Sequence, residues 1–229
     1  MAKTIVISGF GPGISTAVAE KFGKQGFSVA LVARNADRLQ AGVKSLEQKG
    51  IRALAFPTDV SDPAAVEALI ANVRSKLGPI TVLHWNAYGS GGKDLLKASL
   101  AELRAVFDIP VVSLLTATKA ALPDLRTQKE AALLITNGGL GFFDPQVDSM
   151  AVQWGAEGLA VANSAKHKLV GLLSEKLKAE NIYVGEVVVL GLVQGTAFDS
   201  GNATIAPSSI ADKFWDLYQK RKEVSTTIG

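Results

Sequence analysis

The feature that most constrains the fold of this chain is a glycine-rich turn that follows its first apolar segment. Residues 8–15 read Ser-Gly-Phe-Gly-Pro-Gly-Ile-Ser, between a β-branched run at residues 4–8 and a helix-like segment at residues 14–25. Glycines in such a turn let the backbone approach a pyrophosphate, and the N-terminus of the next helix offers N–H groups and positive potential. The pattern predicts a dinucleotide-binding turn, and the alternative is a plain tight turn between a strand and a helix.

Strand-like and helix-like segments alternate along the rest of the chain. Further strands are expected at residues 27–33, 53–56, 80–85, 132–136, 184–190 and 225–228. Helices are expected at residues 36–48, 62–78, 100–122 with an interruption at Pro110, 152–179 and 210–220. Several strands lack period-two alternation, which is typical of a parallel sheet covered on both faces. The predicted fold class is α/β: a Rossmann-type doubly wound parallel sheet in three layers (α/β/α), with residues 1–229 as a single NAD(P)-binding domain.

Composition narrows the classes of function. The chain is 48% apolar and 20% charged, so a sizeable core is expected and disorder is not. The net charge of +3 comes from scattered basic residues, and no nucleic-acid partner is expected. No run of about 18 apolar residues predicts a membrane span, and no signal peptide precedes the first strand. The chain has no cysteine, so neither a disulfide nor a metal site is predicted, and a cytoplasmic location is expected.

The end of the second expected strand bears on cofactor choice. The strand ends Val32-Ala33-Arg34-Asn35. An acidic residue there would bind the adenine ribose 2′-hydroxyl and favour NAD, whereas the guanidinium of Arg34 suits a 2′-phosphate and favours NADP. The alternative is an arginine exposed to solvent at a strand end.

These motifs resemble those of the short-chain dehydrogenase/reductase family. The turn Ser8-Gly-x-x-x-Gly-Ile is similar to the family's Thr-Gly-x-x-x-Gly-Ile-Gly, with Ser15 at the last glycine, where it should tighten the helix–strand contact and place a hydroxyl near phosphate. The family's Asn-Ala-Gly turn appears with Tyr88 in place of its glycine. The likeness runs from residue 3 to about residue 196. It implies an NADP-binding set comprising Gly9, Gly11, Gly13, Ile14, Arg34, Asn35, Asp59, Val60, Asn86, Ala87 and Lys166.

The same resemblance shows that the usual catalytic side chains are missing. In the family an Asn, a Ser, a Tyr and a Lys carry the reaction, and the Tyr hydroxyl exchanges a proton with the substrate oxygen. Here Lys166 is retained, while the other positions hold Pro110, Gly139 and Ala162, and Leu190 replaces a family proline. A methyl group cannot carry a proton, so the usual general acid is absent. The alternative is a slipped alignment, which the Leu-Val-Gly in register after Lys166 opposes.

Three other side chains bear on the missing acid. Tyr88 is the leading surrogate for a catalytic role, and the alternative is that it fills space left by lost side chains. His167 follows Lys166 on a helix and points about 100° away from it, so a surface or interface position is expected. His84 lies within an apolar strand and is expected in the core.

The predicted function is an atypical short-chain dehydrogenase/reductase-like protein that binds NADP(H) and lacks the standard Tyr-dependent ketone and alcohol chemistry. One alternative is an active NADPH-dependent oxidoreductase that uses Tyr88 or water as proton donor, which the retained Lys166 favours. The other is a non-catalytic NADP(H) sensor or structural partner, which the three replacements favour. Whether the chain is an enzyme, and on which small-molecule substrate, stays open. The resemblance also implies a homodimer or homotetramer formed through the two long helices at residues 100–122 and 152–179.

Overall fold

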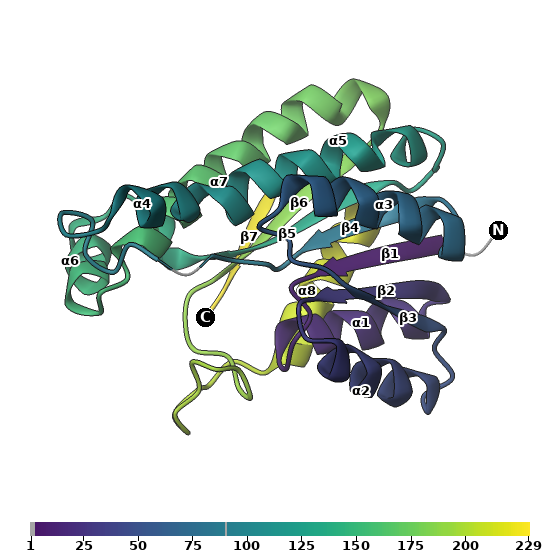
Figure 1. Cartoon of the computed structure of the whole chain (residues 1–229), viewed down its shortest axis with the longest axis horizontal. Helices are drawn as coiled ribbons and strands as arrows, with labels where there is room; N and C mark the ends of the chain where they lie inside the picture. Colours follow the sequence, from purple (N-terminus) through teal and green to yellow (C-terminus); the bar gives the residue numbers. More distant parts are fainter. Residues whose placement is uncertain (1–2, 90) are drawn as a thin grey trace.

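A parallel β-sheet forms the centre of the protein (Figure 1). The computed structural model describes residues 3–89 and 91–229, and these form one sheet of seven strands. The order across the sheet is β3 (Ala53–Pro57), β2 (Phe27–Ala33), β1 (Lys3–Ser8), β4 (Ile80–Trp85), β5 (Ala132–Gly138), β6 (Tyr183–Val189) and β7 (Ser225–Ile228), all parallel. The chain reverses direction across the sheet after β3, which confirms the predicted doubly wound Rossmann-type fold.

Helices cover both faces of the sheet, giving the predicted three layers (Figure 1). One layer holds α3 (Pro63–Leu77), α4 (Leu100–Phe107), α5 (Leu114–Leu125) and α7 (Glu157–Leu177). The other layer holds α1 (Ile14–Lys24), α2 (Ala36–Glu47) and α8 (Pro207–Lys220). Neighbouring strand residues alternate between two cores: Val6 packs in the first, Ile5 and Ile7 in the second. Burial on both faces explains why the strands are apolar without a clear period of two.

The first long helical segment is interrupted where the sequence predicted. After α4, residues Asp108–Ser113 form a π-helical turn (η1) that contains Pro110, and α5 follows directly. Proline has no backbone N–H and its ring crowds the preceding turn, so the regular α-helical ladder breaks there. Leu100–Leu125 is long and apolar enough to cross a membrane by length and composition alone (mean hydropathy 1.5), although no such run was predicted from the sequence. The segment is 39% buried, and it packs against β4, α3 and α7.

The second long helix is not continuous, so the prediction for residues 152–179 was wrong. A separate helix α6 (Pro145–Gln153) ends before Trp154, and α7 begins only at Glu157. Gly155 lies between them with φ of +57°, a conformation that a glycine adopts without strain and that no α-helix contains. Two short 3-10 turns, η2 (Gly139–Gly141) and η3 (Lys178–Glu180), complete the elements of the described chain.

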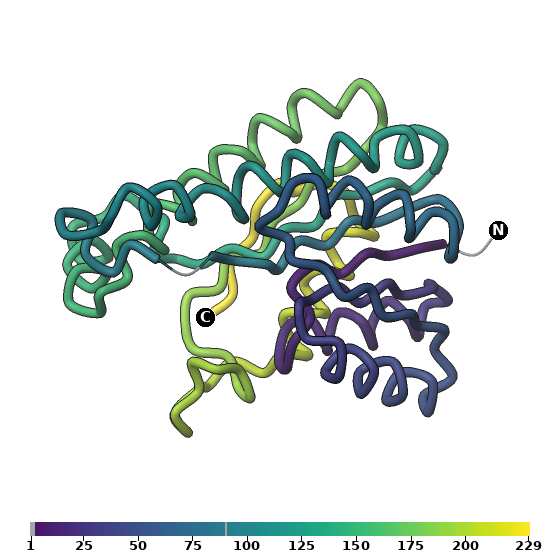
Figure 2. Tube along the Cα trace, viewed as in Figure 1, coloured from purple at the N-terminus to yellow at the C-terminus, as the bar shows by residue number. Residues whose placement is uncertain are grey.

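A long segment without regular structure follows β6. Figure 2 shows residues 190–206 looping away from the sheet before α8 begins. The segment returns to the glycine-rich turn, because Thr196 lies against Gly13. It therefore joins the carboxyl end of β6 to the turn after β1.

Candidate cofactor and active site

The glycine-rich turn leaves β1 under tight steric limits. Gly9 has φ of +82°, and a Cβ there would lie 2.6 Å from the backbone nitrogen of Ala87. Gly13 has φ of +88°, and a Cβ would lie 2.5 Å from Cγ2 of Thr196. At Gly11, in contrast, no described atom lies within 4 Å of a Cβ position. The turn is therefore packed at both ends and open in its middle.

Ser15, at the position of the family's last glycine, closes this turn from inside. Its hydroxyl donates to the Gly9 carbonyl at 2.8 Å and accepts from Nδ2 of Asn86 at 2.8 Å. Ser15 tightens the turn, as expected, but at 1% exposure it has no surface to offer a phosphate. Ile14 begins α1 and packs against the core beneath it.

The end of β2 and the end of β3 lie side by side. Arg34 is exposed, while the side chain of Asn35 accepts a 2.8 Å hydrogen bond from the Arg38 backbone N–H and so caps α2. The Asp59 carboxylate accepts from the backbone N–H and hydroxyl of Ser61, which holds its pKa below the usual value; the positive charge of Arg34 adds to this effect. The capping of α2 by Asn35 was not predicted from the sequence. Val60, next to Asp59, is buried.

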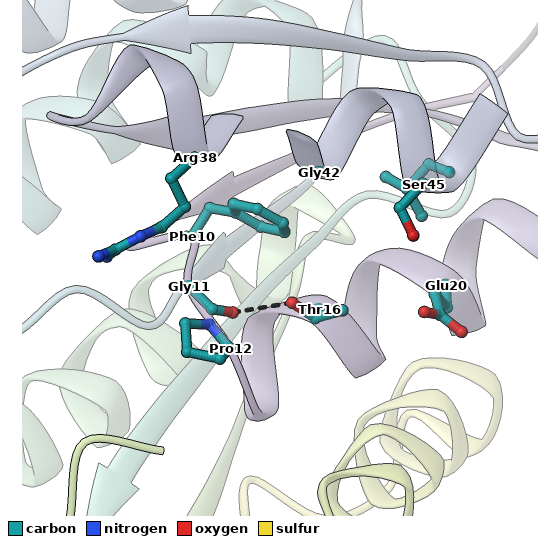
Figure 3. Close-up of a pocket in the computed structure, with 9 residues that line it drawn as sticks. Phe10, Gly11, Pro12, Thr16, Glu20, Arg38, Gly42 and Ser45 are labelled. Carbon is teal, nitrogen blue, oxygen red and sulfur yellow. Dashed lines mark hydrogen bonds between the residues drawn. The ribbon is translucent and has the colours of Figure 1, made fainter. Parts of the chain in front are cut away.

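A hollow of about 230 Å³ lies beside the turn, between α1 and α2 (Figure 3). It is lined by Phe10, Gly11, Pro12, Thr16, Glu20, Arg38, Gly42, Ser45 and Leu46. The Thr16 hydroxyl donates to the Gly11 carbonyl at 2.8 Å, and the exposed Arg38 guanidinium stands at the rim. Arg38 was missed by the sequence analysis, although its place in the first turn of the helix after Arg34 could have indicated it.

Three positions bear on the predicted absence of the family's catalytic side chains. Ala162 on α7 is buried. A Cβ at Gly139, just after β5, would lie 2.7 Å from Cδ2 of Leu190, the end of a half-exposed side chain that would have to turn away for a serine. Pro110 is buried within η1. The sequence shows that Leu190 replaces a family proline, but it does not show that this side chain lies beside Gly139.

A cluster of polar side chains lies between α7 and the sheet. Glu186 in β6 is completely buried and accepts a 2.7 Å hydrogen bond from Nδ2 of Asn137. Its two oxygens lie 3.0 and 2.8 Å from Nδ1 of His167. Burial lowers the pKa of Lys166 to about 8, and the charge of Glu186 opposes this shift. His167 reaches the surface, as expected, with 43% of its side chain exposed, but its contact with Glu186 was not foreseen.

Tyr88 stands on the turn after β4. Its ring is half exposed and pairs with Phe198 in the segment after β6, with the ring centres 5.9 Å apart. Within residues 3–89 and 91–229, its hydroxyl makes no hydrogen bond. Ala87 next to it is buried against Gly9.

Comparison with known protein families agrees with two features of this chain, which are the glycine-rich turn between β1 and α1 and the retained Lys166. A sequence profile described as short chain dehydrogenase matches residues 3–202. This chain belongs to the short-chain dehydrogenase family. A 1-deoxy-11-beta-hydroxypentalenate dehydrogenase of Streptomyces avermitilis is 27% identical over 93% of the chain and 80% of its own length. A diacetyl reductase of Staphylococcus epidermidis is 30% identical over 59% of the chain, but only 52% of its own length is matched.

Solved structures of the short-chain dehydrogenase family share the fold. L-Sorbose reductase from Gluconobacter frateurii, complexed with NADPH and L-sorbose, has a TM-score of 0.85 at 24% identity over 99% of this chain and 95% of its own. A 7α-hydroxysteroid dehydrogenase complexed with NADH has a TM-score of 0.86 at 21% identity over 99% of this chain and 92% of its own. Cofactor use in these structures therefore includes both nucleotides.

The short-chain dehydrogenase fold brings most of the predicted site residues to one edge. Gly9, Arg34, Asp59 and Asn86 all follow the carboxyl ends of parallel strands, where α/β proteins bind ligands. Lys166 is buried on α7, three residues after Asn163, whose backbone carbonyl accepts a 3.1 Å hydrogen bond from Asn137 of β5. Among the described residues, no group of three or more His, Asp or Glu side chains is placed to hold a metal ion.

Proposed function

We propose that this short-chain dehydrogenase binds NADP(H) and lacks the Tyr-dependent ketone and alcohol chemistry of its family. The observation that carries the proposal is the contrast between a turn that fits a dinucleotide and the absence of a side-chain hydroxyl at Gly139 and Ala162, where the resemblance places the family's serine and tyrosine. The nicotinamide ring, when bound, supplies or accepts a hydride. The residues of this chain bind and orient it without a positioned proton donor.

The residues at the glycine-rich turn fit a dinucleotide. Gly9 and Gly13 hold the backbone in conformations that suit glycine, and the open middle at Gly11 leaves room for a ligand against the first turn of α1. The N-terminus of that helix carries unpaired N–H groups and positive potential, which favour a pyrophosphate. Lys166 would contact the nicotinamide ribose, as the family resemblance implies.

Two arginines support NADP over NAD. Arg34 is exposed at the end of β2, where residues 33–35 include no carboxylate. Arg38 stands one helical turn further, at the rim of the hollow beside Gly11. Guanidinium groups make strong charge-assisted hydrogen bonds with phosphate, so the pair suits a 2′-phosphate. A solved structure of a short chain oxidoreductase from Pseudomonas aeruginosa has a similar fold, with a TM-score of 0.82 at 19% identity. That protein is described as NADPH-bound and as containing an atypical catalytic center.

Ala162 and Gly139 argue against ordinary carbonyl reduction. Positioned general acids contribute about 10²–10⁴-fold to rate, and one oxyanion donor contributes about 10²–10³-fold. Ala162 offers no proton, and Gly139 offers no hydroxyl to orient a carbonyl oxygen. Hydride transfer to simple ketones should therefore be negligible even with the cofactor bound.

A second candidate function is an active NADPH-dependent oxidoreductase with Tyr88 as the proton donor. The half-exposed Tyr88 ring on the turn after β4 favours this alternative. Replacing Tyr88 with Phe would abolish turnover if the phenol gives the proton, and would leave it unchanged if water does.

The test is a titration of the unmutated protein with NADPH and NADH, followed by a panel of carbonyl and enoyl substrates with NADPH consumption as readout. We expect NADPH to bind at least about tenfold tighter than NADH, which corresponds to roughly 1.4 kcal/mol, with no measurable turnover of ketones. Equal affinities would contradict the cofactor assignment, and rapid ketone turnover would contradict the loss of chemistry.

We also propose a homodimer or homotetramer built on the layer of α4, η1, α5 and α7. Phe107, Val112 and Leu172 are 41, 42 and 59% exposed on these elements, and each is large and apolar. A two-fold interface would bury them against the same residues of a second copy. Light scattering at micromolar concentration should show more than a monomer, and a Leu172→Glu variant should shift the species toward monomer.

A further inference from the structure

Phe10, in the middle of the glycine-rich turn, points its side chain into the core. The residue is 7% exposed and packs with the apolar side chains of α1, α2 and the sheet face that these helices cover. Its ring meets α2 at Gly42, where a Cβ would lie 2.5 Å from Cε1 and 2.6 Å from Cζ of Phe10. Position 42 therefore accommodates this ring because it carries no side chain.

The backbone conformation of Gly42 does not require glycine. The residue lies inside α2, and it is not among the glycines with positive φ. Glycine within a helix is less favourable than alanine, because it loses more conformational freedom on folding. The other near atom, Cδ1 of Leu31, would lie 3.1 Å from a Cβ and would have to move only slightly. The close approach of the Phe10 ring is therefore the main reason for glycine at this position.

Two separate parts of Phe10 hold the turn to two different elements. The backbone N–H groups of Gly9 and Phe10 donate to the carbonyl of Val32 in β2, at 3.0 and 2.8 Å. The ring of Phe10 holds the turn to α2 at Gly42. A change of the Phe10 side chain alone should therefore leave the turn attached to β2 while it loosens the contact with α2.

The face of α2 that receives the ring also carries Arg38. Residues 38 and 42 are four apart, so they lie on the same face of the helix, one turn from each other. Arg38, Gly42, Phe10 and Gly11 line one hollow, with the exposed Arg38 guanidinium at its rim (Figure 3). The Phe10 ring thus meets α2 one turn from the arginine, beside the part of the turn that is open to a ligand.

We propose that Phe10 is a positioning residue for cofactor choice, because its ring, packed on Gly42, fixes the distance between the glycine-rich turn and Arg38. The inference rests on the proposed NADP(H)-binding function, in which the turn binds the pyrophosphate and Arg34 and Arg38 bind the 2′-phosphate. Both phosphate groups belong to one cofactor molecule, so the spacing of the protein groups has to match the spacing of the phosphates. Hydrogen bonds from a guanidinium to phosphate depend strongly on this geometry.

A comparison of two nucleotides separates positioning from a purely structural role. NADH has no 2′-phosphate, so a displaced α2 should weaken NADPH binding and leave NADH binding almost unchanged. We expect Phe10→Ala to lower the preference for NADPH over NADH about threefold, the same loss as in Arg38→Ala. The double variant should lose no more than either single variant, because Phe10 acts through Arg38. Isothermal titration of each folded variant with both nucleotides measures these preferences.

The contact between Phe10 and Gly42 has a test of its own, which needs no nucleotide. Gly42→Ala should lower the melting temperature by about 4 °C or more, because the added methyl overlaps with the ring. In a Phe10→Ala background the same change should no longer lower it. The matched control is Gly171→Ala in α7, where no described atom lies within 4 Å of a Cβ, and it should raise the melting temperature by about 2–4 °C.

A preference for NADPH that survives intact in Phe10→Ala overturns the inference while the proposed function stands. Losses of preference that add in the double variant, or an equal fall in melting temperature from Gly42→Ala in both backgrounds, overturn it as well. An unmutated protein that binds the two nucleotides equally overturns the proposed function and this inference together. Should Phe10→Ala fail to fold by circular dichroism, Phe10→Leu keeps an apolar side chain, withdraws the ring edge from Gly42 and should show a smaller loss of preference.

Discussion

The two halves of the carboxyl edge of the sheet differ in how closely they follow the motifs of the short-chain dehydrogenase family. Around β1, β2 and β4, Gly9 and Gly13 hold the turn in positive-φ conformations that suit glycine, and Ser15 with Asn86 fixes it from inside. Around β5 and β6, the end of the half-exposed Leu190 side chain lies beside Gly139, which carries no hydroxyl. A nucleotide site and a proton-transfer site can thus diverge independently on one sheet, because their residues come from different strands.

The largest effect is expected from placing the family's serine and tyrosine at positions 139 and 162. Gly139→Ser with Ala162→Tyr should raise ketone reduction by NADPH by a factor on the order of 10² or more, because the half-exposed Leu190 side chain, whose Cδ2 lies 2.7 Å from the new Cβ, can turn away. Adding Leu190→Ala removes that contact and should give a smaller further gain. Stopped-flow NADPH oxidation measures each step. A double variant as fast as the triple would show that Leu190 does not obstruct the site.

The glycine-rich turn after β1 is tested by the pair of variants Gly9→Ala and Gly11→Ala. The former adds a methyl 2.6 Å from the backbone of Ala87 at a positive φ, so it should destabilise the fold by about 2 kcal/mol or more and abolish NADPH binding. Gly11→Ala meets no described atom within 4 Å and should leave stability within about 0.5 kcal/mol. Urea denaturation and fluorescence titration measure both. Equal losses of stability in the two variants would contradict the conclusion that the turn is tightly packed at Gly9 and open at Gly11.

The variant Arg34→Ala tests whether this arginine is the source of a preference for NADPH over NADH. We expect the variant to lose the preference for NADPH, a change of about 1.4 kcal/mol or tenfold in affinity, while NADH binding stays unchanged. Arg38→Ala should lose a smaller part of the preference. Isothermal titration with both nucleotides provides the measurement, and a preference that survives both changes together would exclude these guanidiniums as its source.

The last prediction concerns the pH dependence of stability through His84, which is buried in β4. The pKa of His84 is about 3 in the folded chain and near 6.5 when unfolded, so the unfolded state binds more protons between these values. Stability should therefore fall as the pH drops below about 6.5, by at most about 1.4 kcal/mol per pH unit from this group, and be unaffected above it. Chemical denaturation of His84→Gln should show a shallower decline. His167→Gln, which changes the chain's other histidine, serves as control; a slope identical to the unmutated protein in His84→Gln would contradict the assignment.

Local patterns predicted the sheet well and the packing around the site poorly. The bounds of β2, β4 and β7 agree with the predicted strands, and Pro110 lies in the predicted interruption of the helix, because these features depend on neighbouring residues. The break at Gly155 was missed, since an isolated glycine also occurs within helices. The partners of Glu186 are 49 and 19 residues away along the chain, and no local pattern reveals contacts at such separations.

The contact between Leu190 and position 139 is one that a change of side-chain rotamer can relieve. Leu190 is 49% exposed, and its terminal Cδ2 would lie 2.7 Å from a Cβ at Gly139, whereas its Cα would lie 3.7 Å away. A serine at position 139 would therefore displace the end of a flexible side chain and not the backbone. This position can thus change in a single step, without an earlier substitution at position 190.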